Sequence, residues 1–64
     1  PNTASRYIVA VINELEAAKM RKLLDGYGHP VTHDESDIYE VFLSDMQAER
    51  IEQRHGNKLR MQKE

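Results

Sequence analysis

The sequence predicts an α+β domain whose elements follow the order β-α-β-β-α-β. Two short apolar runs at residues 6–12 and 38–43 are rich in β-branched side chains, as strands are. Each run is followed by a polar helix-start signal and then by apolar residues at helical spacing. A chain of 64 residues makes one domain. We expect residues 1–5 to be a flexible arm and residues 6–64 to fold.

The first half of the chain predicts a central strand and an amphipathic helix. Residues 6–12 are apolar on both sides, as in a strand covered on both faces. Asn13 is a favoured N-cap, and Glu16, three residues later, completes the pattern of a capping box. Gly26 and Gly28 predict a left-handed end to the helix. The expected buried arc of this helix contains Ala17, Met20, Leu23, Leu24 and Tyr27.

The second half repeats the strand-cap-helix pattern after a short edge strand. Because proline cannot donate to a sheet, residues 30–33 predict an edge strand, followed by a polar turn at 34–37. Residues 38–43 predict a strand that pairs with it as a hairpin. Ser44 and Gln47 predict a second capping box, with Asp45 in the first turn. The helix then runs to about Gly56, and residues 58–62 alternate between polar and apolar side chains, as a half-exposed strand does.

Right-handed crossovers between these strands give the split βαβ, or ferredoxin-like, arrangement. It has a four-stranded antiparallel sheet with both helices on one face. The other face of the sheet remains uncovered. We call it the open face.

The strand at 38–43 indicates which side chains point to the open face. Tyr39, Val41 and Leu43 share one side, whereas Ile38, Glu40 and Phe42 share the other. An unpaired carboxylate is costly to bury, so the Glu40 side should face away from the helices. Ile38, Glu40 and Phe42 are therefore the predicted protein interface, together with Tyr7 from the first strand. Single exposed apolar residues are ordinary, but a contiguous patch predicts a cover, either a second copy or another protein.

Composition argues against several other functions. Nine Lys and Arg stand against eleven Asp and Glu, whereas a dedicated nucleic-acid binder normally has a positive excess. A nucleic-acid-binding alternative would use the basic C-terminal residues Arg50, Arg54, Lys58 and Arg60, although interleaved glutamates favour a solvated face. No apolar run approaches the ~18 residues that span a bilayer, so we expect no membrane partner. The chain has no cysteine and no evident leader, which leaves its compartment open.

Catalytic, metal and cofactor sites are not expected. His29 and His33 lie near Asp34 and Asp37, but their spacing matches no common zinc pattern. The serines lack an evident base, and Ser44 has a use as a helix cap. His55 lies at the expected end of the second helix, where the helix dipole favours a cationic imidazole, so C-terminal capping or simple edge packing is expected in place of catalysis.

Four parts of the sequence resemble the prodomain and inhibitor family of subtilisin-type proteases. They are residues 7–9, Gly28-x-x-Val31, residues 39–51 and residues 56–64. The resemblance implies the same element order and an inhibitor or chaperone docked by its sheet, with its C-terminal tail in the protease cleft. The chain departs from that family at its end, where residues 60–64 leave almost no tail.

Two further resemblances agree on the same fold. Residues 6–28 and 41–43 are similar to the small CRISPR adaptation nuclease-like family. That family has an aspartate at the end of its first strand, where this chain reads Val11-Ile12-Asn13. The resemblance therefore does not imply metal-dependent cleavage, and what it still implies is a sheet-mediated dimer. Residues 39–60 are similar to the second half of an RNA-recognition motif, in which Phe42 matches one ring position and Glu40 replaces part of the stacking platform.

Overall fold

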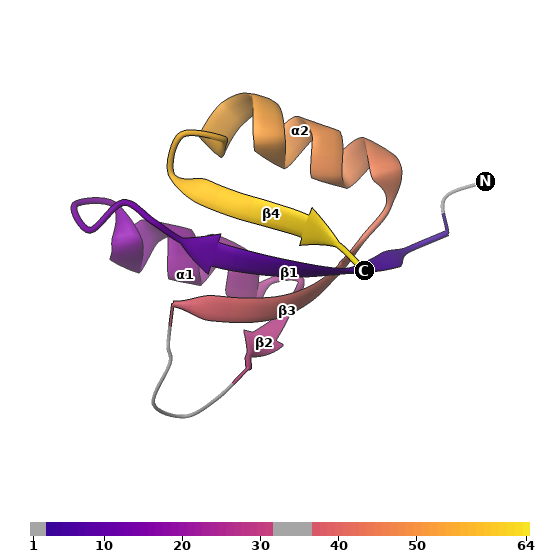
Figure 1. Ribbon diagram of the computed structural model, residues 1–64, viewed down its shortest axis with the longest axis horizontal. Coiled ribbons are helices and arrows are strands. Elements are labelled where there is room, and N and C mark those ends of the chain that lie inside the picture. The colour runs from indigo at the N-terminus through magenta and orange to yellow at the C-terminus, as the bar shows by residue number, and fades with distance from the viewer. Residues whose placement is uncertain (1–2, 32–36) are drawn as a thin grey trace.

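The computed structural model of the protein describes residues 3–31 and 37–64. Its elements are β1 (Ser5–Val11), α1 (Ala17–Asp25), β2 (Gly28–Pro30), β3 (Ile38–Leu43), α2 (Asp45–His55) and β4 (Leu59–Lys63). The strands form one sheet in the order β2-β3-β1-β4, and every neighbouring pair is antiparallel (Figure 1). The predicted ferredoxin-like α+β fold is confirmed, with β1 inside the sheet.

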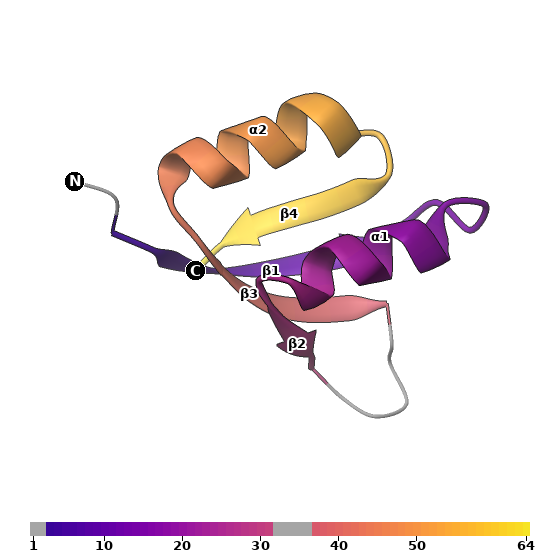
Figure 2. The ribbon, with the colours of Figure 1, turned by 180° about the vertical axis from the view of Figure 1, so that it is seen from behind.

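Both helices pack against the same side of this sheet. Figures 1 and 2 show α1 lying along β1 and β3, and α2 lying beside β4. Met20 and Leu24 from α1 and Ala48 and Ile51 from α2 join one buried cluster with the inward residues of the strands. The strand residues of that cluster are Tyr7, Val9, Tyr39, Val41, Leu43 and Leu59. The opposite side of the sheet has no covering element among residues 3–31 and 37–64.

Helix α1 begins later than the capping pattern predicted. The Asn13 side-chain oxygen accepts a hydrogen bond from the Glu16 amide at 3.0 Å, which closes a turn instead of capping the helix. The N-cap is Glu16, and no side chain caps the first turn. The Glu16 carboxylate binds Lys58 Nζ at 3.0 Å and so does not complete a capping box. A long-range ion pair has replaced the predicted local bond.

The second capping box is present as predicted. Ser44 Oγ accepts from the Gln47 amide at 3.1 Å, and Gln47 Oε1 accepts from the Ser44 amide at 2.9 Å. Asp45 lies in the first turn of α2, and the helix ends at His55. The two orphan amides are therefore satisfied reciprocally.

Neither glycine after α1 has the left-handed geometry that was predicted, and Gly28 is needed because two strands approach closely there. Gly26 caps α1 in a right-handed conformation, and no described glycine has positive φ, so that prediction was wrong. Gly28 opens β2 two residues before the predicted strand start and pairs with Val41. A Cβ at position 28 would collide with the carbonyl oxygen of Glu40 and lie 2.7 Å from Val41 Cα. Residues 32 and 33 of the predicted strand lie outside the described part.

We predict that Gly28→Ala destabilises the fold and that Gly26→Ala does not. The methyl group at position 28 meets the β3 backbone, which cannot move aside without breaking the sheet, so the loss should be about 1–3 kcal/mol. At position 26 the nearest atom to a new Cβ is the Leu23 carbonyl oxygen at 3.3 Å, in helical backbone. Urea unfolding of both variants and of the wild type measures the change in the free energy of unfolding. Equal stabilities of the two variants would show that β2 does not approach β3 so closely.

Candidate protein-binding face

The open face consists of alternate side chains from all four strands. Strand pairing aligns Arg6 with Phe42, Ile8 with Glu40, and Ala10 with Ile38, so these six side chains share one side of the sheet. β2 adds His29 opposite Glu40, and β4 adds Arg60 opposite Ala10 and Gln62 opposite Ile8. This face is built by residues from both halves of the chain.

The structure places three of the four predicted interface residues on the open face. Ile38 and Glu40 are partly buried, and Phe42 is 47% exposed. Tyr7 lies on the other side, 8% exposed within the core. β1 is apolar on both sides, so its sequence alone did not decide its orientation. Pairing of Tyr7 with Val41 places Tyr7 beneath the helices, and we remove it from the predicted interface.

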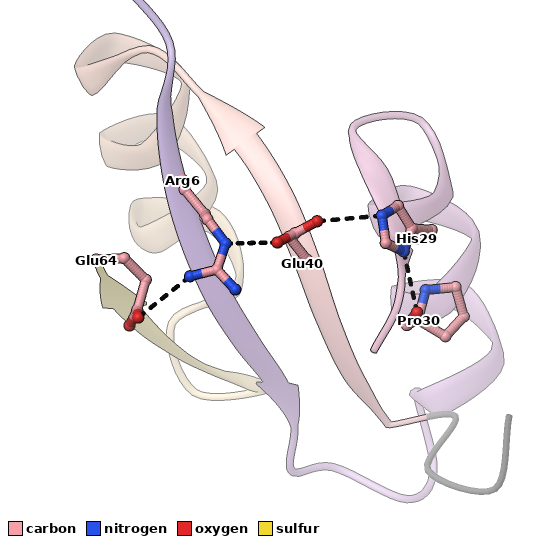
Figure 3. A network of polar contacts seen from close by, with 5 residues as sticks. All are labelled: Arg6, His29, Pro30, Glu40 and Glu64. Atoms are coloured by element: carbon pink, nitrogen blue, oxygen red, sulfur yellow. Dashed lines mark hydrogen bonds and ion pairs between the residues drawn. The ribbon is translucent and has the colours of Figure 1, made fainter. Parts of the chain in front are cut away.

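Four charged or titratable side chains form a network across the open face. Figure 3 shows Glu40 between Arg6 and His29, with Glu64 on the far side of Arg6. Arg6 Nε donates to Glu40 Oε2, and Arg6 Nη1 lies 3.3 Å from Glu64 Oε1. His29 Nε2 lies 3.1 Å from Glu40 Oε1. The network runs diagonally across the sheet, from Glu64 just past the end of β4 through β1 and β3 to β2.

His29 is oriented by two acceptors. Its Nδ1 lies 3.0 Å from the Pro30 carbonyl oxygen, while Nε2 faces the Glu40 carboxylate (Figure 3). Which ring nitrogen donates depends on the tautomer of the imidazole. The edge strand β2 is thereby tied by a side chain to the centre of the sheet.

The pKa of Glu40 is lowered by this network. The hydrogen bond from Arg6 is the main cause, and the charges of Arg6 and His29 act in the same direction against partial burial. The carboxylate that the sequence left unpaired is thus held ionised by two partners. Because Glu40 is paired, it can lie between the apolar residues of β3 without placing an uncompensated charge on an apolar surface.

Apolar side chains surround this network. Ile8, Ala10 and Ile38 are partly buried on the open face. Ile12 and Val31 extend the ladders by one residue, through Ile12 N to Lys58 O at 2.9 Å and Val31 N to Ile38 O at 2.8 Å. By strand alternation Val31 points to the open face, whereas Ile12 follows the end of β1 and lines a hollow with Ala17 and Arg21 of α1. The exposed fractions of Ile12 and Val31 are 50% and 48%, close to that of Phe42.

The structure separates the four basic residues of the nucleic-acid alternative. Arg50 and Arg54 are exposed on α2, which covers the inner side of the sheet, whereas Arg60 belongs to the open face. Lys58 is paired with Glu16, and its side chain is 23% exposed. These four residues do not form one basic surface.

The remaining candidate residues do not gather into a chemical site. His33 and Asp34 lie outside the described residues, while His29 is held by Glu40 and Pro30. Within residues 3–31 and 37–64, no three His, Cys, Asp or Glu side chains are placed to hold a metal ion. The Ser44 hydroxyl is occupied as a helix cap. In the same residues no helix is long and apolar enough to cross a membrane.

His55 differs from the cationic helix terminus that the sequence suggested. Burial lowers its pKa, and the nearby charges of Lys58, Lys19 and Arg54 lower it further. Its Nδ1 is buried without a hydrogen-bond partner in the described residues. The neutral imidazole packs at the end of α2, and desolvation outweighs the helix dipole.

Sequence reasoning missed Arg6, His29 and Glu64 as parts of the open face. Arg6 lies 34 residues from Glu40 and 58 from Glu64, so no local pattern connects them. The one usable signal was the alternation of β1, once its register with β3 is known.

Comparisons with protein-family models, with curated proteins and with solved structures found no match for this chain.

We predict that Arg6→Gln raises the pKa of Glu40 toward its ordinary value of 4.5. Removing the main hydrogen-bond donor removes the main stabilisation of the carboxylate. NMR titration of the Glu40 side chain measures the change, with Arg50→Gln on α2 as the control. An unchanged Glu40 titration in Arg6→Gln would contradict the assigned contact.

The same contact predicts the pH dependence of stability. Because the folded-state pKa is lowered, the stability that Glu40 contributes is present above pH 4.5 and is lost as pH falls through the lowered pKa. The stability difference between wild type and Arg6→Gln should therefore shrink in acid. Urea unfolding of both proteins, at neutral pH and below the folded-state pKa of Glu40, tests whether this stability difference shrinks in acid.

Proposed function

We propose that this domain is a non-catalytic protein-binding domain and that its open face is the binding surface. The observation on which the proposal mainly rests is the gathering of exposed apolar side chains on that face. Five large apolar residues are exposed in the described part of the chain, and Val31 and Phe42 among them lie on this one side, next to the partly buried Ile8, Ala10 and Ile38. A concentration of this kind indicates a surface that is covered in use.

The paired charges support this function in a second way. Covering an unpaired carboxylate or guanidinium costs several kcal/mol, which would oppose docking. Glu40 already has Arg6 and His29 as partners, and Arg6 also contacts Glu64. A protein that covers the centre of the face would therefore remove water from groups whose charges are already compensated.

Two kinds of protein partner fit this surface. A second copy would extend the small core of a chain that has no disulfide. A larger protein, as in the inhibitor or chaperone role of the protease prodomain family, would use the same face. The nucleic-acid alternative lacks this support, because Arg50 and Arg54 lie on α2, over the inner side of the sheet, and Arg60 lies on the opposite side.

We predict that Phe42→Asp abolishes binding through the open face. An aspartate at position 42 replaces an apolar contact with a charge that must be desolvated, and the neighbouring Arg6 is already engaged by Glu40 and Glu64, so affinity should fall by about 100-fold. The binding measurements are solution mass by light scattering across a concentration series, and inhibition of a subtilisin-type protease.

Met46→Asp is the matched control. Met46 is 64% exposed in the first turn of α2, away from the open face, where an acidic residue suits the helix. It should keep whichever binding the wild type shows. Equal effects of the two substitutions, or a wild type that neither associates nor binds the protease, would contradict the proposal.

A further inference from the structure

We propose that a second copy of this chain covers the open face, related by a two-fold axis that crosses the strands at the position of Ile8. This inference rests on the proposed function, because it names the partner of the same face. It follows from where strand register places the charges, and from how a two-fold axis brings them together.

Strand pairing arranges the open face in three levels across the sheet. The first level runs from β3 to β4 and contains Phe42, Arg6 and Glu64. The middle level runs from β2 to β4 and contains His29, Glu40, Ile8 and Gln62. The last level runs in the same direction and contains Val31, Ile38, Ala10 and Arg60.

Arg60 is the feature of this face that suggests a charged partner. It is exposed on edge strand β4, opposite Ala10 and on the same side of the sheet as Glu64. None of the ion pairs among the described residues includes it. Glu64, 39% exposed, has only the longer of the two Arg6 contacts. One edge of the open face therefore has an available cation and a weakly held anion about 13 Å apart along one strand.

In this arrangement the open faces of two copies meet. The two-fold axis lies between the two sheets, runs perpendicular to the strands and passes over Ile8, so the first level of one copy lies over the last level of the other. Each β4 then lies over β4 of the second copy, in the reverse direction. Glu64 faces the second copy's Arg60 and Arg60 faces the second copy's Glu64, so two ion pairs form at the rim. Phe42 and Ile38 face one another in the same way, and Ile8 meets Ile8 at the axis. The contact is self-complementary, as a two-fold interface must be.

The other simple arrangement is less favourable. An axis parallel to the strands would place Arg60 over the second copy's Val31 and Phe42 over the second copy's Arg6. Both copies of Arg60 would then be covered without a carboxylate, which costs several kcal/mol for each charge. In the preferred arrangement Glu40 approaches its own copy, but Arg6 and His29 already balance that carboxylate. Charge pairing therefore selects the axis that crosses the strands.

The test is a reciprocal charge exchange at positions 60 and 64. We expect wild type to reach twice the chain mass of 7.4 kDa in light scattering as concentration rises. Arg60→Glu and Glu64→Arg each turn both rim pairs into like charges, so each alone should weaken association by roughly 10- to 100-fold. An equimolar mixture should recover the dimer mass, since one chain then has two acidic rim residues and the other two basic ones.

Arg54→Glu on α2 makes the same charge change away from the open face and should leave association intact. Circular dichroism confirms that each variant keeps its fold. A wild type that stays at the mass of one chain would overturn the inference. So would a dimer that Arg60→Glu does not weaken, or a mixture that does not recover it. Protease binding that Phe42→Asp abolishes would still support the proposed function in each of those cases.

Discussion

The contact between the inner side of β3 and the two helices sets the orientation of the whole sheet. Tyr39, Val41 and Leu43 are at most 2% exposed, against Met20 and Leu24 of α1 and Ile51 of α2. Because side chains alternate along a strand, this burial forces Ile38, Glu40 and Phe42 to the other side. Sliding β3 by one residue would bury Glu40 in the core, so the register is strongly specified.

The same constraint explains why the open face is mixed in character. Its β1 side chains Ile8 and Ala10 are apolar because β1 lies inside the sheet, between β3 and β4. Its charges come from positions where a partner is available across the sheet, as Arg6 and His29 are for Glu40. A surface that is apolar but has its central charges internally paired can be exposed in a free chain and covered in a complex. This dual character distinguishes it from a second core and from an ordinary solvated face.

The fold was predictable because its signals are local. The apolar run at 38–43, the capping box of Ser44 and Gln47, and the helical spacing of Met20 and Leu24 each act within a few residues. Glu40 alone was enough to orient β3, since one buried carboxylate outweighs small differences among apolar side chains. These signals agree with one another, as they do in sequences that specify one structure.

The features that sequence reasoning missed depend on long-range pairing. β1 is apolar on both sides, so the position of Tyr7 followed only from its register with β3. α1 starts later than predicted: Asn13 closes a turn onto the Glu16 amide, and the Glu16 carboxylate pairs with Lys58, 42 residues away. Of the two readings of His55, capping and packing, the structure favours packing, because burial and neighbouring cations act against the helix dipole. In the open face, Phe42 and Glu40 could be named in advance, whereas His29 and Glu64 required the assembled sheet.

An NMR dilution series on isotope-labelled protein tests most directly whether the uncovered side of the sheet is where this chain makes its contacts. We expect the concentration-dependent shifts to gather on β1 and β3, at Arg6, Ile8, Ile38 and Phe42, while the exposed residues of α1 and α2 stay constant. Shifts that gather instead on the outer surfaces of the helices would contradict the account.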